Sequence, residues 1–137
     1  MKALVLALAV LASACGPPAM MGGVITSSGG ALGDFVFAPD GCDYKPDLGA
    51  IDMTDSTRPG VTLRIVRPQT AQVAVMLANT GAGGGPREVS LSNGASCTIH
   101  KGYHAVLYGD RGVGIRIDCT TPDGGHVWGT AGAGVCK

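Results

Sequence analysis

Hydrophobic and polar residues alternate in several short runs beyond residue 34. In the clearest run, Val113, Ile115, Ile117 and Cys119 share one face, whereas a glycine, an arginine and an aspartate share the other. A period of two with charged residues opposite apolar ones predicts a half-buried strand. Comparable runs lie at 35–37, 61–67, 71–78, 89–92, 95–100, 103–108 and 126–131. About seven to nine short strands without a helical period predict an all-β fold, a small antiparallel β-sandwich or a barrel-like domain.

Two turns between these runs have informative sequences. Asn93-Gly94 predicts a hairpin between the runs on either side of it, because both residues tolerate the positive φ of a type I′ turn. Residues 122–125, Pro-Asp-Gly-Gly, predict a second turn. With that turn, Cys119 lies opposite Trp128, so we expect Trp128 to be a core residue packed against a disulfide.

The first residues have the features of an export signal. Met1-Lys2 carries a positive charge, residues 3–11 are continuously apolar, and Ala12, Ser13 and Ala14 are small. This order is typical of a secretory signal peptide, here residues 1–14.

Small residues directly before Cys15 resemble the lipobox of bacterial lipoproteins. The resemblance implies that the signal is removed, that Cys15 is modified with fatty acids such as palmitate, and that the protein is anchored in the cell envelope. Because Gly16 follows the cysteine, where the family's inner-membrane retention signal has Asp, the resemblance implies the outer membrane. Ala12-Ser13-Ala14 also fits ordinary secretion, and the chain would then be periplasmic or secreted.

The remaining chain divides by composition. Residues 16–33 contain six Gly, two Pro and two Ser and no charged residue. Such a composition predicts a flexible tether, so residues 15–33 are expected to form the lipidated cysteine and its tether. Residues 34–137 are long enough for a single all-β domain.

Five cysteines are an odd number for an exported chain. Lipidation of Cys15 leaves four, which in an oxidising compartment predict two disulfides. These four are Cys42, Cys97, Cys119 and Cys136, and the sequence leaves their pairing open. Their spacing lacks the short C-x-x-C pairs of zinc sites, so we expect no metal and no cofactor.

Charge excludes one class of partner. Ten Lys and Arg residues balance ten Asp and Glu residues. A neutral chain lacks the positive surface that phosphate backbones require, so nucleic-acid binding is not expected.

Candidate chemistry is sparse. Neither a G-x-S-x-G elbow nor a phosphate-binding G-x-x-x-x-G-K-[ST] loop occurs, and the glycine run 81–85 lacks the spacing of a dinucleotide site. His100 and His104 are four residues apart, which on a strand places them roughly 13 Å apart, too far for one metal ion.

An acidic segment precedes the longer strands. It offers oxygen ligands for Ca²⁺, although its spacing differs from a D-x-D-x-D-G loop, and aspartates also occur at turns for their bonds to backbone amides. The aspartates are Asp34, Asp40, Asp43, Asp47, Asp52 and Asp55.

These patterns predict a non-enzymatic envelope lipoprotein, a structural or protein-interaction module whose partners are the membrane and an envelope or surface protein. The alternative is a small-ligand or Ca²⁺-binding envelope protein.

Overall fold

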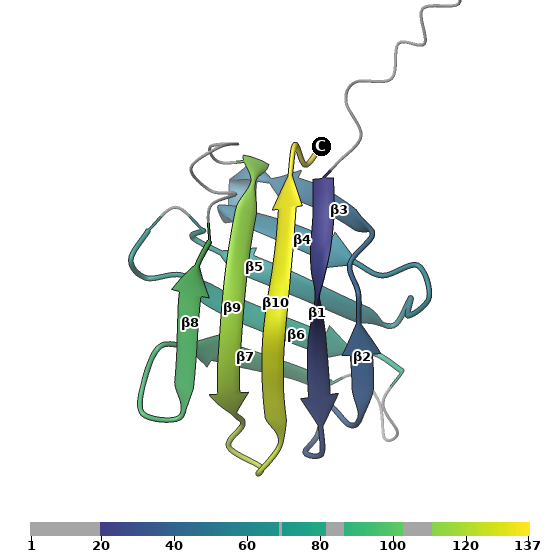
Figure 1. Cartoon of the computed structure of the whole chain (residues 1–137), viewed down its shortest axis with the longest axis vertical. Coiled ribbons are helices and arrows are strands. Elements are labelled where there is room, and N and C mark those ends of the chain that lie inside the picture. The colour runs from purple at the N-terminus through teal and green to yellow at the C-terminus, as the bar shows by residue number, and fades with distance from the viewer. Residues whose placement is uncertain (1–19, 69, 82–86, 103–110) are drawn as a thin grey trace, which may run out of the picture.

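The computed structural model describes residues 20–68, 70–81, 87–102 and 111–137. Two five-stranded antiparallel sheets pack face to face, with the strands of the rear sheet running across those of the front one (Figure 1). The predicted all-β sandwich with two disulfides is therefore confirmed.

Sheet A contains the first and the last strand of the described chain. Its strand order is β2-β1-β10-β9-β8. The bounds are β1 Met20–Ser28, β2 Phe35–Phe37, β8 Cys97–Lys101, β9 Val113–Thr120 and β10 His126–Gly134.

Sheet B is a meander with strand order β3-β4-β5-β6-β7. The bounds are β3 Gly41–Lys45, β4 Ala50–Thr54, β5 Val61–Val66, β6 Ala74–Asn79 and β7 Arg87–Ser92. A single 3-10 turn, η1 Pro46–Leu48, joins β3 to β4.

The glycine-rich segment before residue 34 differs from the predicted tether. Strand β1 lies between β2 and β10, and its register runs from Met20 opposite Gly134 to Ser28 opposite His126. Composition suggested a flexible chain, but Ile25 of this segment is fully buried between the sheets. Burial of such apolar residues outweighs the weak strand preference of glycine.

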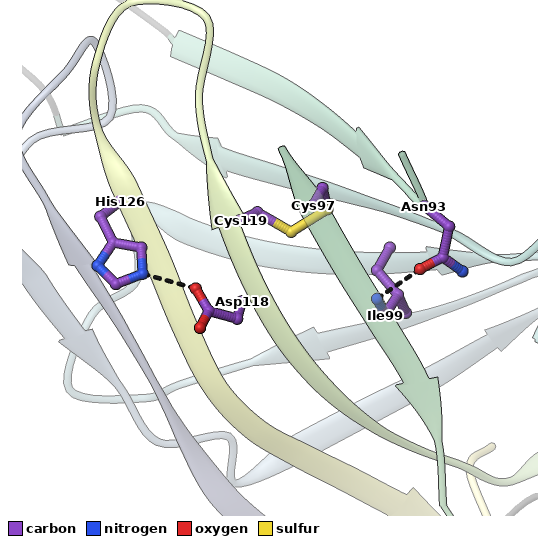
Figure 2. Close-up of a disulfide and its surroundings, with 6 residues drawn as sticks. All are labelled: Asn93, Cys97, Ile99, Asp118, Cys119 and His126. Atoms are coloured by element: carbon purple, nitrogen blue, oxygen red, sulfur yellow. Dashed lines mark hydrogen bonds and ion pairs between the residues drawn. A yellow bond between two sulfur atoms is a disulfide. The ribbon is translucent and has the colours of Figure 1, made fainter. Parts of the chain in front are cut away.

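The predicted hairpin at Asn93-Gly94 is also wrong. The strand before it, β7, belongs to sheet B, and the strand after it, β8, belongs to sheet A. The segment therefore carries the chain from one sheet to the other. The Asn93 side chain accepts a hydrogen bond from the amide of Ile99 at 2.6 Å, which occupies a backbone group on edge strand β8 (Figure 2).

The core lies between the two sheets and is almost entirely aliphatic. Its largest fully buried side chains are Phe37, Ile25, Leu32, Ile51, Met53, Leu63, Ile65, Leu77, Ile117, Val75, Val113 and Val127.

The two disulfides connect different parts of the sandwich. Cys42–Cys136 joins β3 of sheet B to the chain just after β10 of sheet A. Cys97–Cys119 joins directly opposed residues of β8 and β9 within sheet A (Figure 2). The pairing that the sequence left open is thus one bridge between the sheets and one within a sheet.

Within the described ranges, no helix has the length and apolar character that crossing a membrane requires.

Candidate functional site

The loop between β9 and β10 decides which way Trp128 faces. Thr121 donates its amide hydrogen to the Gly125 carbonyl at 2.8 Å, and its hydroxyl accepts a hydrogen bond from the Gly125 amide at 2.8 Å. These bonds enclose Thr121 in the loop, so that His126 pairs with Thr120 rather than Thr121.

A shift of one residue reverses the face of every later side chain on the strand. Cys119 therefore lies opposite Val127, and Trp128 lies opposite Asp118 on the outward face. The prediction that Trp128 packs in the core is wrong, since 36% of it is exposed. The alternation of this run already indicated an outward Trp128, because the apolar residues Val127 and Ala131 occupy the inward positions.

Trp128 is held by its neighbours on the surface. The His126 ring stacks on it with ring centroids 4.4 Å apart and the planes 22° apart. His126 is itself held by Asp118, whose Oδ1 lies 2.7 Å from Nε2 (Figure 2). Both members of this pair are well exposed, so its main effect is to orient the rings rather than to stabilise the fold.

Two glycines shape the same part of the sheet. Gly129, directly after Trp128, has φ +130°, and a Cβ there would lie 2.1 Å from the carbonyl oxygen of Val24. Gly23 has φ +93°, and a Cβ there would lie 2.2 Å from the carbonyl oxygen of Thr130. Only glycine permits this backbone conformation and close approach of β1 to β10.

Arg116 projects from the middle of the same face. On β9 it lies directly between Thr130 of β10 and His100 of β8. Its side chain is exposed and, within the described part of the chain, has no hydrogen-bond or ion-pair partner. Asp118, two residues further along the strand, is paired with His126 instead. The face thus presents a guanidinium that is unpaired among the described residues.

Exposed apolar side chains gather on this face as well. Of the four large ones among the described residues, three lie on the outward side of sheet A, namely Val24 on β1, Val36 on β2 and Trp128 on β10. A shallow groove of about 450 Å³ runs between Trp128 and Arg116. We refer to Val24, Val36, Arg116 and Trp128 as the sheet A patch.

The outward face of sheet B has the opposite character. Asp52 and Arg64 are directly opposed on β4 and β5, and two hydrogen bonds of 2.6 and 2.8 Å join them side by side. The hydrogen bonds to Asp52 raise the pKa of Arg64 above its usual value, against the opposing effect of burial. These two opposite charges therefore satisfy each other.

The aspartates of the acidic segment serve different partners. Asp55 accepts hydrogen bonds from the Ala38 amide at 2.9 Å and from the Thr57 hydroxyl at 2.7 Å. Asp34 accepts one from the Gly29 amide at 2.6 Å, and Asp52 pairs with Arg64. The contacts of Asp34 and Asp55 match the role of aspartate at turns that the sequence offered beside the Ca²⁺ interpretation.

The described residues contain no cluster of three or more His, Cys, Asp or Glu side chains that would hold a metal ion. His100 is exposed on β8 beside Arg116. His104, the proposed lipidation site Cys15, the signal peptide 1–14 and most of the glycine run 81–85 lie outside the described residues.

Comparison of the chain with protein-family models, with curated proteins and with solved structures gave no match.

Proposed function

We propose that this protein is a non-enzymatic interaction module of the cell envelope, which a lipid on Cys15 anchors to a membrane and which binds a protein partner through the sheet A patch. One observation carries the proposal: three exposed apolar side chains share one face with an arginine that has no partner among the described residues. Tryptophan and arginine are the residues that most often dominate binding energy at protein interfaces. Grouped apolar residues with polar neighbours are typical of interaction sites.

The position of β1 supports a close attachment to the membrane. Four residues separate Cys15 from Met20, so a fully extended chain spans at most about 18 Å between them. Met20 pairs with Gly134 at the end of sheet A that also holds the C-terminus (Figure 1). Trp128 lies six residues further along β10, roughly 20 Å from that end. The patch would then face sideways, clear of the lipid surface.

The anchor is tested by labelling with a radioactive fatty acid. Wild type should incorporate label and fractionate with the outer membrane, because two or three acyl chains give stable attachment. Cys15→Ser should lose the label and leave the membrane fraction. An unlabelled wild type would contradict the anchor and favour the periplasmic or secreted alternative.

The binding face is tested separately, on protein extracted from its own membrane with a mild detergent. We expect wild type to sediment as a complex heavier than the protein in its micelle. Trp128→Ala should release the partner, whereas Met76→Ala, on the outward face of sheet B, should not. Equal sedimentation of all three proteins would contradict the assignment of this face.

A further inference from the structure

We propose, on the basis of this proposed function, that the partner segment is acidic and partly apolar: a carboxylate pairs with Arg116 while an adjacent apolar side chain packs on Trp128. This inference names the chemistry that the sheet A patch recognises. It depends on four features of the face. They are the guanidinium of Arg116, which has no partner among the described residues, the position of the Asp118 carboxylate, the indole of Trp128 stacked on His126, and the exposed valines.

The Arg116 guanidinium is exposed and available to a partner's carboxylate. Arg116 is exposed and makes no ion pair or hydrogen bond within the described ranges. The planar guanidinium matches a carboxylate through two parallel hydrogen bonds, as Asp52 and Arg64 show on the other sheet. On sheet A no described residue pairs with Arg116 in this way, and a partner's carboxylate fits the guanidinium.

The nearest carboxylate of the face is already engaged. Asp118 lies on the same strand and the same side as Arg116, yet its Oδ1 contacts His126 at 2.7 Å. Because His126 also stacks on Trp128, Asp118 helps to hold the indole in place. The positive charge of Arg116 and the oriented apolar ring of Trp128 therefore lie on either side of a groove of about 450 Å³.

The apolar part of the face favours a polypeptide over a saccharide. Two of its three exposed apolar side chains are valines, at 45% exposure for Val24 and 49% for Val36. Aliphatic groups are covered best by the side chains of another protein. From Val36 on β2 to Arg116 on β9 the face spans three strand spacings, about 14 Å. An extended segment of about five residues covers that distance.

The test uses a random peptide library displayed on phage and the purified mature chain in detergent. Peptides selected by wild type should carry Asp or Glu within a few residues of a large apolar residue. Arg116→Gln should weaken a selected peptide by at least about tenfold, the effect of losing one charged hydrogen-bonded contact. Trp128→Ala should abolish measurable binding, and Met76→Ala should leave the affinity unchanged.

The outcomes separate this inference from the proposed function. Selected peptides without an acidic preference, which still require Trp128, would overturn the acidic partner and leave the binding face intact. Peptides that bind all variants equally would overturn both. Failure to select any peptide, or binding of oligosaccharides on a glycan array in its place, would overturn the assignment of a polypeptide.

Discussion

The two sheets of this sandwich treat the charged residues on their outward faces differently. On sheet B, Asp52 and Arg64 face each other across neighbouring strands and form two hydrogen bonds. On sheet A, Arg116 faces Thr130 and His100, and the nearest carboxylate is held by another residue. An arginine that is paired within its own sheet serves the fold, whereas an arginine with no partner among the described residues, beside exposed apolar groups, is suited to a partner from outside.

The two sheets also differ in the backbone conformation of their strands. Among the described residues, both glycines with positive φ inside strands lie in sheet A, Gly23 on β1 and Gly129 on β10. Sheet B forms its five strands without such a residue in the described ranges. Glycine adopts such conformations readily, whereas any other residue at these two positions would be strained.

The largest expected effect concerns the connection between the sheets. Removing the Cys42–Cys136 bridge with two alanine substitutions frees a loop of 94 residues and should cost about 4–5 kcal/mol of unfolding free energy. Removing Cys97–Cys119, which closes 22 residues within sheet A, should cost about 3 kcal/mol. Urea unfolding of both variants measures the difference. A greater loss from the bridge within sheet A would reverse the assigned roles.

A substitution at Gly129 tests the special backbone of sheet A. Gly129→Ala should lower the free energy of unfolding by about 3 kcal/mol, because positive φ and a clash with the Val24 carbonyl both oppose a side chain. Gly22→Ala on β1 is the control, since nothing lies within 4 Å of its added Cβ. We expect it to change stability by less than about 0.5 kcal/mol. Equal effects would show that the backbone of β10 is ordinary.

The same substitution on the two faces tests the charge comparison directly. Arg64→Met leaves the nearly buried Asp52 carboxylate unpaired and should cost about 2 kcal/mol, a value that allows for the 35% exposure of the Arg64 side chain. Arg116→Met removes no hydrogen bond or ion pair within the described residues and should change stability by less than about 0.5 kcal/mol. Thermal or urea unfolding measures both. Similar losses would mean that Arg116 also serves the fold.

The smallest expected effect is the dependence of stability on pH that Asp55 contributes. This residue, just after β4 of sheet B, accepts a hydrogen bond from Ala38, just after β2 of sheet A. Burial opposes ionisation of Asp55, but hydrogen bonds from Ala38 and Thr57 and the charge of Arg58 outweigh it and lower its pKa. The unfolded chain then binds more protons, so stability is lost as the pH falls from about 4, the unfolded pKa, through the lower folded value.

Asp55→Asn should remove that share of the pH dependence, about 1.4 kcal/mol for each unit by which the pKa is lowered. Urea midpoints of wild type and variant between pH 2 and 6 measure it. Parallel curves for the two proteins would contradict the depressed pKa.

The sequence predicts the fold class well because alternation and turn residues act locally. The run from Val113 to Cys119 forms strand β9 with its apolar side inward, as its period of two indicates. Long-range pairing is less accessible, because composition does not show that the glycine-rich start of the domain inserts between β2 and β10. Disulfide pairing likewise depends on which sheet each cysteine occupies.

A difference of one residue in a loop explains why the sequence did not predict the candidate site. A loop one residue longer than expected, closed by the hydrogen bonds of Thr121 with Gly125, moves Trp128 from the core to the surface. Arg116 lies opposite Thr130 and His100 rather than a carboxylate because of the cross-strand register, which the order of residues along one strand does not reveal.

Site-specific photo-crosslinking in the producing cell tests most directly whether a partner binds sheet A rather than sheet B. A photoreactive amino acid replaces Thr130 on the outward face of sheet A in one protein and Thr62 on the outward face of sheet B in another. We expect a discrete crosslinked product from position 130, absent when Trp128→Ala is added, and none from position 62. A product from position 62 alone, or equal products from both, would contradict the account.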